Sequence, residues 1–123
     1  MLFNQTSFKN CIQLEPQQIT KVVVKNGNTG VSVETEDPAK INDFMQELNS
    51  QALKKELFGA NKIGYAYFID FYTNDSNGYL RYTTGHGFSK MDNFSKDSAN
   101  GNYTEKDYDA TIKIIDKFYN SLS

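Results

Sequence analysis

The residue types that carry most enzyme chemistry are scarce in this chain. His86 is its one histidine and lies between two glycines, in a segment expected to turn. A catalytic site would pair it with Ser89, Thr84 or Cys11 as nucleophile and with Asp92 as the orienting carboxylate. None of these spacings is diagnostic, and an exposed histidine in a glycine-rich turn is the simpler interpretation. We therefore predict no catalytic residues and a protein that is not an enzyme.

Metal and cofactor sites are not indicated either. One cysteine and one histidine cannot build a disulfide or a His-based zinc site, and we expect Cys11 to act as a small buried hydrophobe. The segments 73–78 and 96–102 are rich in Asp, Asn and Ser. A calcium-binding loop begins with Asp and has Glu at its twelfth position, whereas these segments fail that pattern at one or both ends. We expect turns there, with no metal and no cofactor.

Aromatic side chains around a single arginine are the best candidate for binding. Arg81 is the one arginine among 13 basic residues, and it lies between Tyr79 and Tyr82 on an expected strand. Arginine beside aromatic rings can hold a carboxylate or phosphate, or anchor a protein interface. With His86 and Phe88 nearby, these residues form the predicted binding surface, and a protein or cell-envelope ligand is the predicted partner.

Charge and hydropathy exclude two other classes of function. The chain has 13 basic and 15 acidic residues, a formal charge of −2, which disfavours nucleic-acid binding. The segment Gly64–Phe68 resembles the aromatic strand of RNA-recognition motifs, but its basic residue and final aromatic are misplaced, and the element order differs. We expect Tyr65 and Tyr67 to pack in the sheet instead. No segment approaches the roughly 18 apolar residues of a transmembrane helix.

The elements that must position these residues follow from periodicity. The 123 residues suit a single domain spanning residues 1–123, with 1–7 as a flexible lead. Alternation, β-branched residues and turn signals predict strands, and apolar spacings of three and four predict helices. The expected strands are Phe8–Leu14 (a weak edge strand), Ile19–Lys25, Val31–Thr35, Ile63–Tyr72, Tyr79–Thr84 and, as a short extra strand, Phe88–Phe94.

Two helices complete the prediction. One begins after Asp37-Pro38 and frays or bends near Asn49-Ser50, before Leu53 and Leu57. The other follows a capping sequence over Thr104–Asp107. The order is β-ββ-α-ββ(β)-α. It predicts an α+β two-layer sandwich in which a curved antiparallel sheet carries two helices on one face. The aromatic strand 63–72 is apolar on both faces, so we place it in the middle of the sheet.

Four segments together resemble small extracytoplasmic domains of uncharacterised lipoproteins from Gram-positive bacteria. They are ITKVVVKNGNTGVSVET, DPAKINDFMQEL, GYAYFIDFYTNDSNGYLRYTT and NYTEKDYDATIKIIDKFY, within Gln18 to Tyr119. The resemblance implies a non-enzymatic binding or accessory domain of a cell-envelope or secreted protein, and an extracytoplasmic location. The alternative is a cytosolic immunity or inhibitor protein that blocks a partner protein. A true start at Met1 would favour that alternative, because no signal peptide or lipobox precedes Cys11.

Overall fold

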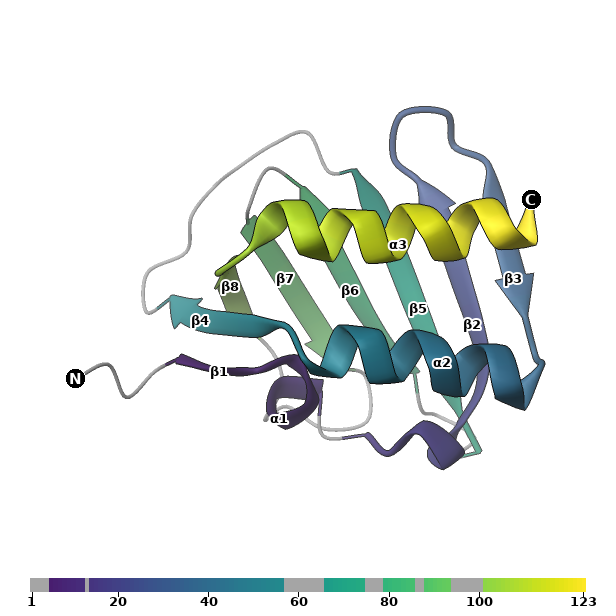
Figure 1. The fold of residues 1–123 in the computed structure, drawn as a ribbon, viewed down its shortest axis with the longest axis horizontal. Coiled ribbons are helices and arrows are strands. Elements are labelled where there is room, and N and C mark those ends of the chain that lie inside the picture. The colour runs from purple at the N-terminus through teal and green to yellow at the C-terminus, as the bar shows by residue number, and fades with distance from the viewer. Residues whose placement is uncertain (1–4, 13, 57–65, 75–78, 86–87, 94–100) are drawn as a thin grey trace.

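An antiparallel sheet lies behind two long helices in the computed structural model of this chain (Figure 1). The structure describes residues 5–12, 14–56, 66–74, 79–85, 88–93 and 101–123. Within them the sheet has eight strands in the order β1-β4-β8-β7-β6-β5-β2-β3. The strands are β1 Gln5–Ser7, β2 Ile19–Asn26, β3 Ser32–Thr35, β4 Ala52–Glu56, β5 Tyr67–Thr73, β6 Tyr79–Gly85, β7 Phe88–Asn93 and β8 Gly101–Glu105.

The helices are α1 Phe8–Ile12, α2 Pro38–Asn49 and α3 Tyr108–Leu122, with a short 3₁₀ turn at Pro16–Gln18. Figure 1 shows α2 and α3 crossing the strands on the same side of the sheet. The predicted α+β architecture, with an antiparallel sheet and two helices on one face, is thereby confirmed.

The residues of β2 and of the turn after it explain why β2 and β3 form a hairpin. β-Branched residues favour the extended backbone of β2, and the turn that follows contains Gly30 with φ +76°, a value that glycine adopts without strain. The Asn26 side-chain oxygen accepts the backbone N–H groups of Asn28 and Thr29, at 2.8 and 3.1 Å. This bonding fixes the turn and brings β3 back beside β2.

Aspartate caps start both long helices. The Asp37 carboxylate accepts the Ala39 amide at 2.9 Å, and Pro38 occupies the first turn of α2. Asp107 accepts the Ala110 amide at the start of α3. The buried residues of the two helices recur at helical spacing and pack on the sheet and on each other: Ile41, Phe44, Met45 and Leu48 of α2, and Thr111, Ile115, Phe118 and Tyr119 of α3.

Four segments differ from the prediction. Gln5–Ser7, expected within a flexible lead, is strand β1 and pairs with β4. Phe8–Ile12 is a helix instead of an edge strand, because Phe8, Cys11 and Ile12 lie at helical spacing and all three are buried. Ala52–Glu56 is strand β4, which pairs with β1 and β8, where a frayed helix was expected. The segment 101–105 is strand β8, so Glu105 belongs to the sheet and the helix cap is Asp107. Residues 63–65 and 97–100 of the predicted strand and loop lie outside the described residues.

Strand β5 shows how the sheet separates its two faces. Tyr67, Ile69 and Phe71 are buried beneath the helices, while Phe68 and Tyr72 are half-buried on the opposite face. The strand lies between β6 and β2, so its predicted place inside the sheet is confirmed. We call the face that carries Phe68, Asp70 and Tyr72 the outer face, and the face under the helices the inner face.

Candidate functional site

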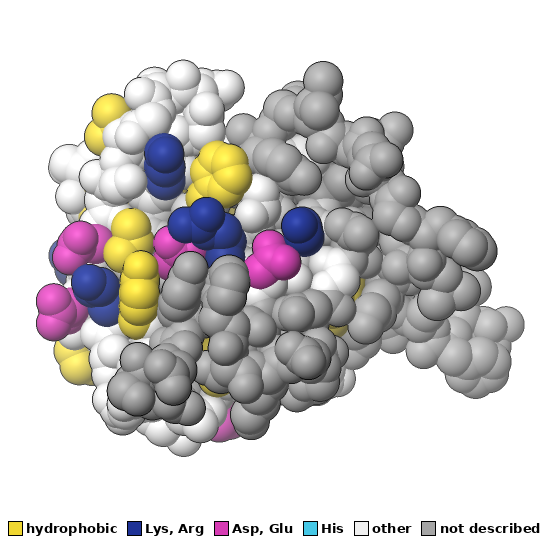
Figure 2. Space-filling view, turned by 180° about the vertical axis from the view of Figure 1, so that it is seen from behind, with side chains coloured by type: hydrophobic (Ala, Val, Ile, Leu, Met, Phe, Trp, Pro, Cys, Tyr) yellow, Lys and Arg dark blue, Asp and Glu magenta, His cyan; other side chains and the backbone are white. Residues whose placement is uncertain are grey.

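Arg81 lies on the outer face, in a row of residues that crosses neighbouring strands. In the strand register Val23 of β2 is opposite Asp70 of β5, and Asp70 is opposite Arg81 of β6. Lys25 and Phe68 form the adjacent row. Side chains two apart on a strand share a face, so all five project on the same side. Figure 2 shows charged and hydrophobic side chains gathered on this face.

The Arg81 guanidinium donates two hydrogen bonds to the Asp70 carboxylate. Nε donates to Oδ1 at 2.7 Å and Nη2 donates to Oδ2 at 3.0 Å. The Asp70 side chain is 12% exposed and that of Arg81 is 43% exposed, so one edge of the pair still faces solvent. The guanidinium carbon also lies 5.9 Å from the centre of the Phe68 ring, within cation–π range. This bonding holds Arg81 in one orientation on the face.

A hollow of about 310 Å³ opens beside this pair. We call it the outer-face hollow. Its lining residues are Val23, Lys25, Ser32, Phe68, Asp70 and Arg81. Two more contacts of the same kind flank it: the Lys21 ammonium lies 4.9 Å from the centre of the Tyr72 ring, and Lys90 lies 3.8 Å from Asp92. The face thus combines aromatic rings with basic side chains along three neighbouring strands and β7.

Tyr82 does not belong to this surface. It follows Arg81 in β6, so it points to the inner face, where it is 0% exposed and lies edge-on to Phe8 with ring centres 5.0 Å apart. Its hydroxyl donates to Oε2 of Glu105 in β8. The prediction that placed Tyr82 in an exposed binding surface is therefore wrong, because alternation sends consecutive strand residues to opposite faces.

Glu105 is a buried carboxyl group, only 5% exposed. Its Oε2 accepts hydrogen bonds from Tyr82 and from Thr84 Oγ1, the latter at 2.6 Å, whereas its Oε1 is buried without a hydrogen-bond partner among the described residues. Burial raises the pKa of Glu105, and the two donated hydrogen bonds only partly oppose it. Burial, then the Glu105 charge, raises the pKa of Tyr82 as well.

The other predicted site residues are placed only in part. Tyr79 begins β6 opposite Tyr72, and Phe88 begins β7 opposite Gly85. Their side chains and the whole of His86 lie outside the described residues, so the proximity of His86 to Arg81 stays a prediction. Cys11 is buried, as predicted, but in helix α1. Burial, followed by the nearby Cys11 thiol, raises the pKa of Tyr103 to about 12.

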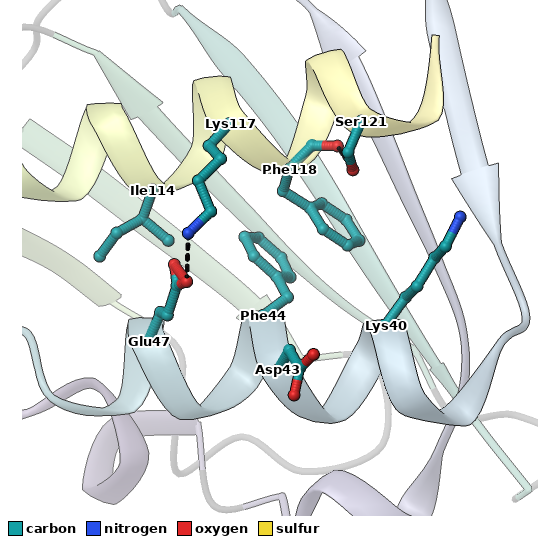
Figure 3. A pocket seen from close by; sticks show the side chains of 8 residues that line it. All are labelled: Lys40, Asp43, Phe44, Glu47, Ile114, Lys117, Phe118 and Ser121. Atoms are coloured by element: carbon teal, nitrogen blue, oxygen red, sulfur yellow. Dashed lines mark hydrogen bonds and ion pairs between the residues drawn. The ribbon is translucent and has the colours of Figure 1, made fainter.

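A second hollow, of about 240 Å³, lies between the two long helices. Figure 3 shows the rings of Phe44 and Phe118 facing each other at its centre; they stack with centres 3.8 Å apart. The Lys117 ammonium bridges to Glu47 at 2.8 Å across one end. Both rings are more than 90% buried, so this hollow offers a partner little apolar surface. We therefore regard the outer-face hollow as the candidate site.

The described residues show neither a metal-ligand cluster nor a carboxylate in the hollow without a basic partner. In the described segments, no three His, Cys, Asp or Glu side chains are grouped to hold a metal ion. The one carboxylate in the described lining of the hollow, Asp70, is bound by Arg81. None of the described helices combines the length and apolar character needed to cross a membrane.

Sequence reasoning found Arg81 but missed the residues around it. One signal was available for Asp70: a hairpin in which Tyr72 faces Tyr79 also sets Asp70 opposite Arg81, two residues further from the turn. Val23, Lys25 and Ser32 had no such signal, because they reach the hollow through the pairing of β2 with β5, which is distant in sequence.

Comparisons with protein-family models, curated proteins and solved structures found no match to this chain. The resemblance to lipoprotein domains therefore stays a prediction from the residue pattern. A functional proposal has to rest on the geometry of the outer face.

Proposed function

We propose that this chain is a non-enzymatic binding module that contacts a partner protein through the outer face of its sheet. The observation that carries the proposal is the Arg81–Asp70 pair, held in a fixed bidentate geometry over Phe68 yet open to solvent along one edge. Arginine and aromatic residues are enriched where protein interfaces concentrate their binding energy. Arginine that is oriented before binding also loses less conformational entropy when a partner arrives.

The apolar groups on this face support the same proposal. Phe68, Tyr72 and Val23 remain half-buried although helices cover only the opposite face. Covering them with a partner would remove apolar surface from water, which is favourable in proportion to the area. The cell-envelope location implied by the sequence resemblance is kept as part of the proposal.

Affinity capture with matched variants tests the proposal. Tagged wild-type protein, Phe68→Ala, Arg81→Ala and Lys117→Ala are incubated with soluble and envelope fractions of the source organism, and bound proteins are quantified by mass spectrometry. Lys117→Ala is the matched control, because it also removes the basic member of an ion pair, but on the helix side.

We expect a partner whose recovery falls about tenfold with Phe68→Ala and with Arg81→Ala, which corresponds to about 1.4 kcal/mol each, and stays unchanged with Lys117→Ala. Circular dichroism checks that each variant is folded. The proposal is contradicted if Phe68→Ala and Arg81→Ala recover as much of every partner as the wild type does. It is also contradicted if Lys117→Ala lowers the recovery of the partner as much as they do.

A further inference from the structure

The described part of the outer face carries more basic than acidic side chains. Its strands contribute five basic residues and three acidic ones, whereas the complete chain has a formal charge of −2. The basic residues are Lys21, Lys25, Lys54, Arg81 and Lys90, and the acidic residues are Glu34, Asp70 and Asp92. A ligand that approaches the described part of this face therefore meets more positive than negative charge.

Within the described lining of the outer-face hollow, Lys25 accounts for the net positive charge. Asp70 neutralises Arg81 through two hydrogen bonds, which leaves the exposed Lys25 as the uncompensated charge of the lining. Among the described residues no carboxylate lies within ion-pair distance of the Lys25 ammonium. The described lining thus carries a net charge of +1, which complements a single negative charge.

The rest of the lining indicates what carries that charge. Val23 and Phe68 offer half-buried apolar surface next to Lys25, and Ser32 adds a hydroxyl group. A volume of about 310 Å³ is near the lower end for small-molecule pockets. A carboxylate on a short apolar stem, such as a glutamate side chain, matches this combination of charge, size and surface.

We infer that the outer-face hollow receives a carboxylate side chain from an acidic segment of a partner protein, with Lys25 as the residue that recognises it. This inference rests on the proposed function and adds the chemistry of the partner. Lys25 provides the attraction, the Arg81–Asp70 pair forms the opposite wall, and Phe68 packs against the stem of the incoming side chain.

Nuclear magnetic resonance tests the inference without knowledge of the partner. Isotope-labelled protein is titrated with an acetylated, amidated pentapeptide containing two glutamates, with the same peptide containing two glutamines, and with sodium acetate. We expect the glutamate peptide to shift the backbone resonances of Lys25, Phe68 and Arg81. We expect Lys25→Gln to weaken this binding about threefold or more, as is usual for an exposed charge pair, and Lys117→Gln to leave it unchanged.

Three results would overturn the inference: equal shifts from the glutamine peptide, equal shifts from acetate at the same carboxylate concentration, or no shifts in the hollow at about 5 mM peptide, a concentration that would largely saturate a site with a Kd of about 1 mM. Equal shifts from acetate would assign the hollow to small free carboxylates. If the captured partner depends on Phe68 and Arg81 but the glutamate peptide fails these tests, the binding module stands and only its acidic specificity is wrong.

Discussion

Replacing Glu105 by glutamine should change how the stability of the protein depends on pH. In the folded state Glu105 is buried, and its pKa is raised above its ordinary value of 4.5. The folded state therefore binds a proton more readily than the unfolded state, and this difference stabilises the fold fully below pH 4.5. The contribution is lost as pH rises from 4.5 through the folded-state pKa. Within that window the loss is at most about 1.4 kcal/mol for each pH unit.

Glutamine at position 105 can accept the same two hydrogen bonds as Glu105, but it does not bind or release a proton in this pH range. Its amide oxygen can accept from Tyr82 and Thr84 as Oε2 does, whereas its amino group takes the place of Oε1, which has no partner among the described residues. An unsatisfied buried donor costs about 1–3 kcal/mol, but this cost does not vary with pH. The informative quantity is therefore the free energy of unfolding of Glu105→Gln minus that of the wild type, which should increase as pH rises.

Urea denaturation at pH values from about 4 to about 8, followed by circular dichroism, measures this difference. Subtraction removes the contributions of the other titrating groups, which both proteins share. Glu47→Gln serves as the control, because Glu47 is a partly exposed carboxylate on α2 and its removal should change stability by no more than about 0.5 kcal/mol throughout. A difference for Glu105→Gln that stays constant, or that decreases as pH rises, would refute the reasoning.

Three further substitutions test an ion pair, a ring stack and a helix cap of the fold. Arg81→Lys should lower the free energy of unfolding by only about 0.5–1 kcal/mol, because the bidentate bond to Asp70 is lost in a half-exposed setting; larger losses in chemical denaturation would contradict this. Phe44→Ala should cost about 3–5 kcal/mol, because it removes a buried ring stacked on Phe118, and a thermal melt that barely moves would argue against that stack. Asp37→Ala should cost about 1 kcal/mol through loss of the α2 cap, and the same substitution at exposed Asp43 should cost less.

Local sequence predicted the parts of the fold that local physics stabilises. The β2–β3 hairpin has β-branched strands and a turn with glycine at positive φ, and α2 has an aspartate cap followed by proline. Strand β4 lacks such signals: its sequence, ALKKE, favours a helix in isolation. It becomes a strand because β1 and β8 offer hydrogen-bonding edges on both sides, and tertiary pairing outweighs a weak intrinsic preference.

The same division explains the site. A hairpin register relates residues close in sequence, so the partner of Arg81 could have been derived from the turn between β5 and β6. Lys25 reaches the hollow through the pairing of β2 with β5, which are distant in sequence. Glu105 in β8 bonds to Tyr82 and Thr84 of β6 across the intervening strand β7. Glu105 was expected at the start of a helix because its local sequence resembles a cap, yet the sheet recruits it as a buried acceptor for Tyr82.

Arg81 and Tyr82 are consecutive residues of β6 that bond to other strands on opposite faces of the sheet. A half-exposed ion pair contributes about 1 kcal/mol or less, so folding stability alone does not account for the bidentate geometry of Arg81 with Asp70. In the proposed binding function that geometry has a use. A partner that covers the outer face would remove water from the pair, which strengthens the attraction between its charges. Because Asp70 already neutralises Arg81, covering them would bury no isolated cation, the costly case in an interface. The remaining attraction at the hollow would then depend on Lys25, which in our proposal distinguishes an acidic partner from a neutral one.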